Sequence, residues 1–160
     1  MKIAIILLVS IFIFIPCWSH QRHKKHHKSQ NPKVLAVAMT RTGCYGRCPG
    51  YEVKANADGT IIYTGLKFVD DTGKYYKKRT AAYIAPIIDE VITYRMDTCA
   101  KFYRTRVPDL PGFNITITYA DSTKVIREAG GGPFYLNKLA DELEKSGKRT
   151  DTAGWQKMKE

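Results

Sequence analysis

The chain has 160 residues, with 26 lysines and arginines against 15 aspartates and glutamates and a formal net charge of +11. That length is enough for one ordinary domain after removal of a targeting segment. The charge does not indicate nucleic-acid binding, because five of the basic residues cluster in residues 20–33 without interleaved aromatic residues.

Residues 1–19 have the three parts of a secretory signal peptide. Lys2 supplies a positive start, residues 3–15 an apolar stretch, and Cys17-x-Ser19 small residues before a cleavage point. The apolar run is shorter than the roughly 20 residues of a spanning helix, and Pro16 stands where a lipoprotein signal has a small residue. We therefore predict export, to the periplasm or outside the cell, with an uncleaved, membrane-associated anchor as the alternative.

Residues 20–33 are basic and histidine-rich and contain no acid, which predicts a solvated, disordered tail. All the histidines of the chain lie in it: His20, His23, His26 and His27. Such a tail is expected to bind Cu²⁺, Ni²⁺ or Zn²⁺ weakly, or to contact anionic surfaces of the cell envelope. We predict no dedicated metal site, no cofactor and no nucleic-acid partner.

Regular structure is expected from residue 34 onwards. Residues 34–41 are apolar and β-branched, which predicts a mostly buried strand. After a turn with two cysteines, residues 51–65 alternate between polar and apolar side chains around Asp58-Gly59, which is a hairpin signal.

The register of this hairpin follows from its side chains. A strict two-residue loop would split the apolar residues between the two faces of the sheet. A three-residue loop with Gly59 in the left-handed conformation pairs Ala55 with Ile61 and Val53 with Tyr63. We favour the second, because it gathers five residues on one face: Tyr51, Val53, Ala55, Ile61 and Tyr63.

The next segment is expected to lead from polar turns into a helix. Residues 66–79 are polar and turn-rich, with a short extended stretch around 74–77. Residues 83–96 have apolar side chains at helical spacing. Pro86 has no backbone N–H and is therefore expected in the first turn of that helix. A loop is predicted over residues 97–112.

A second hairpin and a second helix complete the pattern. Residues 113–119 alternate strictly, and a short turn leads into a partner strand over 123–128. The sequence "GGGP" at 130–133 opens a helix that Gly147 ends. Its buried stripe is expected to consist of Leu136, Leu139, Ala140 and Leu143.

This order of strand, hairpin, helix, hairpin and helix predicts the fold class. We expect an α+β domain over residues 34–147, with a mainly antiparallel sheet and both helices packed on one face. Residues 148–160 form a polar C-terminal tail, in which Trp155 is expected to fold back over an apolar edge.

The cysteine turn "TGCYGRCPGY" (42–51) allows two interpretations. Cys44 and Cys48 are close enough in a tight turn for a disulfide, which exported proteins tend to form. Cys-x-x-x-Cys-Pro also occurs in exported copper chaperones, where two thiolates bind Cu(I). We favour the disulfide, because Pro49 leads into a strand here and not into a helix. Cys99 is then left over, either buried or available for mixed pairing.

The remaining residues show no pattern that is typical of an enzyme active site. The segment "REAGGGPF" (127–134) offers N–H groups at a helix start beside Arg127, but its glycines are explained by the turn that they make. No Walker lysine or nucleotide fingerprint is present. No histidine follows residue 33, and the acidic pairs fall on solvated faces. We therefore predict a non-enzymatic protein without catalytic residues.

The region around the cysteines resembles a known family. The residues that carry the resemblance are Arg41, Thr42, Cys44, Tyr45, Gly46, Cys48, Pro49, Tyr51, Asp58, Gly59, Thr60, Tyr63, Gly65, Thr72 and Gly73. They fit the opening motif of the domain of unknown function 6438, found in small exported bacterial proteins, and the similarity continues more loosely to residue 146. The resemblance supports the domain limits and the cysteine pair, and it implies no reaction.

These observations predict an exported binding or envelope-associated domain whose partner is a protein or an envelope component. The binding face is expected around the cysteine turn, at Arg41, Tyr45, Arg47 and Tyr51. The alternative is a thiol-redox or Cu(I)-handling protein that uses Cys44 and Cys48.

Overall fold

The computed structural model describes residues 32–44, 46–106, 110–149 and 152–159. The expected signal peptide (1–19) and almost all of the expected basic tail (20–33) lie outside these residues. The described strands are β1 (Val34–Arg41), β2 (Gly50–Asn56), β3 (Thr60–Lys67), β4 (Gly73–Lys78), β5 (Phe102–Arg104), β6 (Phe113–Tyr119), β7 (Thr123–Ala129) and β8 (Gln156–Lys157). The helices are α1 (Ala81–Thr93), α2 (Phe134–Gly147) and the short 3₁₀ helix η1 (Met96–Thr98).

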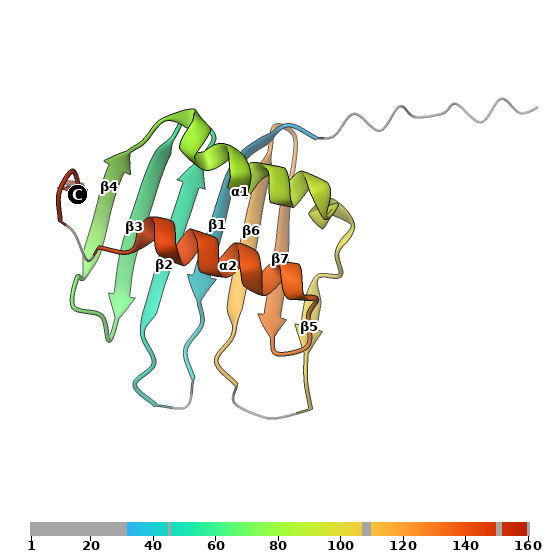
Figure 1. Cartoon of the computed structure of the whole chain (residues 1–160). Helices are drawn as coiled ribbons and strands as arrows, with labels where there is room; N and C mark the ends of the chain where they lie inside the picture. The colour runs from blue at the N-terminus through green and yellow to red at the C-terminus, as the bar shows by residue number, and fades with distance from the viewer. Residues whose placement is uncertain (1–31, 45, 107–109, 150–151, 160) are drawn as a thin grey trace, which may run out of the picture.

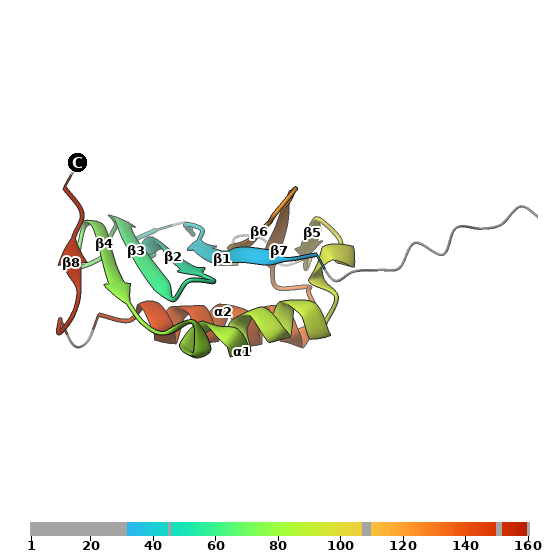
Figure 2. The same cartoon turned by 90° about the horizontal axis from the view of Figure 1, so that it is seen from above.

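These strands form one sheet in the order β5-β7-β6-β1-β2-β3-β4-β8. All neighbours are antiparallel except β5 and β7. Both α1 and α2 lie on the same face of the sheet (Figures 1 and 2). The predicted α+β class, with a mainly antiparallel sheet and two helices on one face, is confirmed.

The core fills the space between the sheet and the helices. Ile115 and Ile117 in β6 point towards the helices and are fully buried, whereas the Thr116 side chain between them points to the open face. Helix α1 contributes Ile84, Ile87 and Val91 to this layer. The predicted stripe of α2 is confirmed, since four of its residues are buried: Leu136, Leu139, Ala140 and Leu143. Burial of these faces holds both helices on the sheet.

The register of the first hairpin is also confirmed. Val53 pairs with Tyr63 and Ala55 pairs with Ile61 across β2 and β3. Gly59 in the turn has φ +94°, the left-handed conformation that the three-residue loop requires. Tyr51 and Tyr63 therefore lie on the same face as the buried core, at the end of the sheet that carries the cysteine loop.

The start of α1 differs from the prediction. The helix begins at Ala81, so Pro86 lies in its second turn and not in its first. Proline in that position removes the hydrogen bond to the carbonyl of Ala82. Both residues are on the exposed side of the helix, where water can bind the freed carbonyl oxygen, and this explains why the helix tolerates the proline.

Two segments expected to lack strands contain short ones. The predicted loop over 97–112 includes β5, which runs parallel to β7. The predicted C-terminal tail contributes β8, which pairs with β4 at the other edge of the sheet. Trp155, just before β8, is partly buried against the core, in agreement with the expected fold-back. Cys99 is buried with a free thiol.

One observation on membrane insertion concerns the described ranges alone. Neither helix there has both the length and the apolar character that crossing a bilayer requires.

Candidate functional site

The cysteine loop connects β1 to β2 at one end of the sheet. Cys44 and Cys48 form a disulfide with their Cα atoms 5.6 Å apart, which confirms the predicted pair. The amide of Thr42 donates a 3.0 Å hydrogen bond to the carbonyl of Gly112, so that the loop is also tied to the segment before β6. The disulfide thus fixes the distance between the end of β1 and the start of β2.

The side chain of Lys67, from β3, supports this loop. A Cβ atom added to Gly50 would lie 3.0 Å from Cγ of Lys67, and one added to Gly43 would lie 3.1 Å from its Nζ. The lysine stem therefore runs along the loop in the space that these glycines leave free. Because Phe68 follows Lys67 directly, the same contact connects the cysteine loop to the segment after β3.

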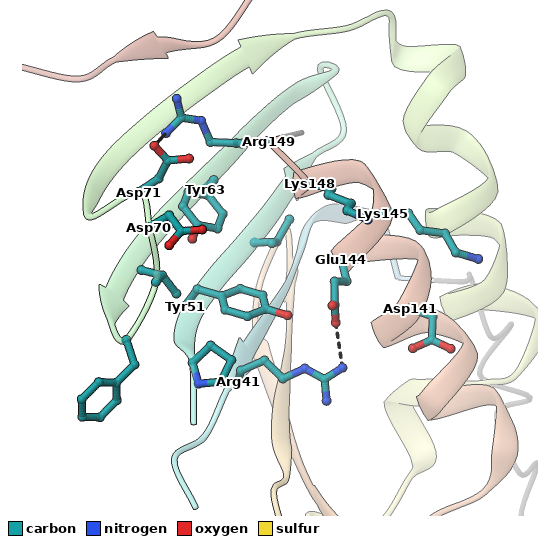
Figure 3. Close-up of a pocket in the computed structure, with 15 residues that line it drawn as sticks. Arg41, Tyr51, Tyr63, Asp70, Asp71, Asp141, Glu144, Lys145, Lys148 and Arg149 are labelled. Carbon is teal, nitrogen blue, oxygen red and sulfur yellow. Dashed lines mark hydrogen bonds and ion pairs between the residues drawn. The ribbon is translucent and has the colours of Figure 1, made fainter. Parts of the chain in front are cut away.

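A cavity of about 640 Å³ lies beside this loop, on the helix-covered face of the sheet. Its floor is formed by β2 and β3, one wall by residues 68–71, and the other wall by the C-terminal half of α2 (Figure 3). This volume is within the range of small-molecule sites. The lining residues are Arg41, Pro49, Tyr51, Val53, Tyr63, Phe68, Val69, Asp70, Asp71, Asp141, Glu144, Lys145, Gly147, Lys148 and Arg149.

One end of the cavity is closed by a contact between β1 and α2. Nη2 of Arg41 donates a 2.7 Å hydrogen bond to Oε2 of Glu144 (Figure 3). Burial alone would raise the pKa of Glu144, but hydrogen bonds from Arg41 and the Tyr51 hydroxyl outweigh it, so this pKa is lowered. Burial also raises the pKa of Tyr51 to about 12, so its phenol stays neutral. This end therefore presents an ion pair and a neutral hydroxyl.

A second ion pair lies at the other end of the cavity. Nη1 of Arg149 is 3.1 Å from Oδ1 of Asp71, within ion-pair distance. The guanidinium carbon of Arg149 lies 3.6 Å from the ring centroid of Tyr75, and the side chain is only 10% exposed. Its Nε and Nη1 make no hydrogen bond to any residue that the structure describes. The arginine is thus held by charge and by ring stacking.

The floor and the rim of the cavity are aromatic. The rings of Tyr51 and Tyr63 stack with their centroids 5.9 Å apart. Phe68 stands at the rim, 56% exposed, with a φ of +53°. A left-handed conformation is unusual and strained for a bulky residue, and such strain concentrates at binding and catalytic sites.

The wall that contains Phe68 is held close to the sheet at a glycine. A Cβ atom on Gly65 would lie 1.9 Å from the carbonyl oxygen of Asp71. Only a glycine allows the segment after β3 to fold back at this distance. The opposite wall makes a comparable approach, since a Cβ atom on Gly147 would lie 2.4 Å from Cγ2 of Val53. Both walls are therefore packed directly onto the strands.

The charges of the lining cancel. Four lining residues are acidic and four are basic: Asp70, Asp71, Asp141, Glu144, Arg41, Lys145, Lys148 and Arg149. Asp70 and Lys148 lie on opposite walls (Figure 3), and neither forms an ion pair within the described part of the chain. Lys148 does contribute to the electrostatic environment of Glu144. Among the described residues, the cavity thus has an acid and a base without ion-pair partners on opposite walls.

The residues that the sequence indicated fall in different places. Arg41 and Tyr51 both line the cavity. Arg47 is exposed on the cysteine loop and does not line it. Tyr45 lies outside the described residues. The remaining lining residues were missed, although Tyr63 could have been found, because the predicted hairpin register places it beside Tyr51.

Two other candidates from the sequence have structural explanations. The N–H groups of Gly130 and Gly131 donate hydrogen bonds of 2.6 and 2.9 Å to Oε1 of Glu128, so an internal carboxylate already binds these donors. No helix begins at Cys44 or Cys48, in contrast to the copper chaperones, and the two residues form a disulfide. Within the described ranges, no three His, Cys, Asp or Glu side chains are grouped to hold a metal ion.

Comparison with known proteins gives one family. The family model described as "Domain of unknown function (DUF6438)" matches residues 35–147. No curated protein matches the chain significantly. The matched range includes β1 except for its first residue, the cysteine loop, β2, the segment after β3 and all of α2.

Proposed function

The chain belongs to the DUF6438 family, and from that premise we propose that it is an exported, non-enzymatic binding domain that holds a small polar ligand in the cavity beside its cysteine loop. Export is supported by the signal-like residues 1–19 and by the Cys44–Cys48 disulfide, since disulfides persist in oxidising compartments.

The observation that carries the proposal is the conformation of Phe68. An exposed aromatic residue in the left-handed region lowers stability and gains little from burial. Asparagine or glycine would fit this backbone better. The ring of Phe68 lies at the rim of a cavity whose floor is formed by tyrosines. In this position it would cover a bound molecule.

The charge pattern indicates the chemistry of the ligand. A lining with as many acids as bases does not attract a molecule of high net charge. Asp70 and Lys148 instead suit a dipolar ligand, with its ammonium at one wall and its carboxylate at the other. The hydroxyl of Tyr63 can hydrogen-bond a ligand from the floor, whereas that of Tyr51 already interacts with Arg41 and Glu144. A short peptide with free termini has these properties.

A set of related peptides tests this function. Calorimetric titration of the purified protein with trialanine is expected to detect binding, and acetylated or amidated trialanine should bind more weakly, since each lacks one terminal charge. Phe68→Gly should weaken binding of the unblocked peptide at least tenfold. Equal affinity for blocked and unblocked peptides, or no binding at all, would contradict the proposed ligand class.

A further inference from the structure

The edge of the sheet formed by β4 and β8 carries an unusual concentration of positive charge. The basic residues in and next to these strands are Lys74, Lys77, Lys78, Arg79, Lys157 and Lys159. Neither 73–80 nor 156–159, both fully described, contains an aspartate or glutamate. Asp58, in the turn between β2 and β3, interacts electrostatically with Lys78 at one end of the edge.

This edge accounts for the whole positive excess of the domain. Residues 34–160 contain 20 basic and 15 acidic side chains, an excess of five. Six of the basic residues belong to the β4–β8 edge, so the other 14 are matched by the 15 acids. The rest of the domain is therefore close to neutral in net charge.

The strand geometry spreads these charges along a line. Side chains on one face of a strand repeat at roughly 6.6 Å. Lys74 and Lys78 pair with Thr64 and Thr60 of β3 and share the open face of the sheet. Lys77 points to the opposite face, as does Lys157, whose Nζ lies 5.9 Å from the ring centroid of Tyr75. The cations therefore run along the edge on both faces.

Protection against edge-to-edge pairing does not explain the whole pattern. Lysines on an exposed edge strand discourage contact with another sheet. The edge of β4 is already partly covered by β8, through the pairs Tyr75–Lys157 and Tyr76–Gln156. Yet most of the six cations are on β4 or immediately after it, and Lys159 lies beyond the last paired residue.

We propose that the β4–β8 edge binds a linear polymer of the polyphosphate type, and not a nucleic acid. A polymer with an anionic group on every unit can meet several cations of the row at once. Five of the six residues are lysines, which bind phosphate as point charges without the fixed geometry of arginine. This suits repeated contacts along a chain better than one specific phosphate pocket. The proposal is independent of the cavity and its ligand.

Binding of the full chain to long-chain inorganic polyphosphate, measured by calorimetry at several NaCl concentrations, tests the proposal. The test variant is Lys74→Gln/Lys78→Gln/Lys159→Gln. Its matched control, Lys101→Gln/Arg104→Gln/Arg127→Gln, removes three exposed cations from the opposite edge of the same sheet. Both variants keep the basic residues 20–33, so any contribution from that segment cancels in the comparison.

We expect the test variant to bind at least tenfold more weakly than the control. Its slope of log affinity against log salt should be less steep by roughly 0.7–0.9 for each lysine removed. Orthophosphate should not compete at matched phosphate concentration. Equal loss in both variants would show that only net charge matters and would overturn the proposal. Tighter binding of alginate, a carboxylate polymer, than of polyphosphate would overturn its assignment to phosphate.

Discussion

Nη2 of Arg41 lies 2.7 Å from Oε2 of Glu144, although the two residues are 103 positions apart in the sequence. The first stands at the end of β1, where the cysteine loop begins, and the second in the C-terminal half of α2. The contact joins the loop to the helix at one end of the cavity. The disulfide, the sheet and the helix therefore all position residues around the same cavity.

Acid should weaken the domain through Glu144. Its pKa in the folded state is lowered from the usual 4.5, because the Arg41 contact outweighs burial. A lowered folded pKa contributes stability above the unfolded pKa, and this is lost as the pH falls from about 4.5 through the folded value. Urea unfolding between about pH 3 and pH 6 should show a shallower acid decline for Glu144→Gln than for wild type. An identical decline would mean that the contact is not made in solution.

Phe68→Gly should separate stability from binding. Left-handed backbone costs a residue such as phenylalanine about 1–2 kcal/mol, and glycine loses roughly 0.5–1 kcal/mol of that gain through its freer unfolded state. Unfolding free energy should therefore be unchanged or higher by up to about 1.5 kcal/mol, while peptide binding weakens at least tenfold. Phe68→Ala keeps the strained backbone and removes the ring. It should weaken binding without raising the unfolding free energy. A glycine variant less stable than wild type by more than about 1 kcal/mol would contradict the strain.

Gly65→Ala should displace the wall formed by residues 68–71. Its Cβ would lie 1.9 Å from the carbonyl oxygen of Asp71, a backbone atom that cannot move alone. Overpacking of this kind costs about 1–3 kcal/mol. Gly43→Ala is the matched control, because its nearest neighbour is the flexible end of Lys67. Thermal unfolding should show a loss of stability for Gly65→Ala only. Similar losses of stability in both variants would refute the idea that Gly65 is needed for the close approach to Asp71.

Removal of the disulfide should cost stability and binding together. Closing so short a loop contributes roughly 2 kcal/mol, so Cys44→Ser/Cys48→Ser should lower the unfolding free energy by about that amount. Binding should weaken as Arg41 and Tyr51 lose their fixed spacing. Thiol titration with and without reductant, followed by Cu(I) competition, tests the rival function. Easy reduction with tight Cu(I) binding would favour the thiol-redox or copper-handling alternative.

The fold was predictable where a pattern repeats and one face is buried. Alternation in β2 and β3 gave their register, because a slip of one residue would turn Val53 and Ala55 away from the core. Strands β5 and β8, with three and two residues, are too short to carry such a pattern. The start of α1 was predicted too late, on the assumption that Pro86 must lie in the first turn. The helix tolerates Pro86 in its second turn, because burial of its apolar face outweighs one lost hydrogen bond on its exposed side.

The cavity was predictable only in part. Arg41 and Tyr51 were indicated because they flank the cysteines. Glu144 and Arg149 were not, since only the packing of α2 on the sheet brings them to the cysteine loop and to Tyr75. The left-handed conformation of Phe68 could not be predicted from the sequence, because that conformation is normally adopted by glycine or asparagine.

Amide chemical-shift mapping during titration with trialanine is the decisive measurement for binding in the cavity, because it reports where on the domain a dipolar ligand binds. We expect saturable shifts confined to the strand ends at Tyr51 and Tyr63, the wall 68–71, and residues 144–149 at and just after the end of α2. Phe68→Gly should abolish them. Shifts confined to other parts of the domain, or no shifts up to millimolar peptide, would show that the cavity does not bind such a ligand.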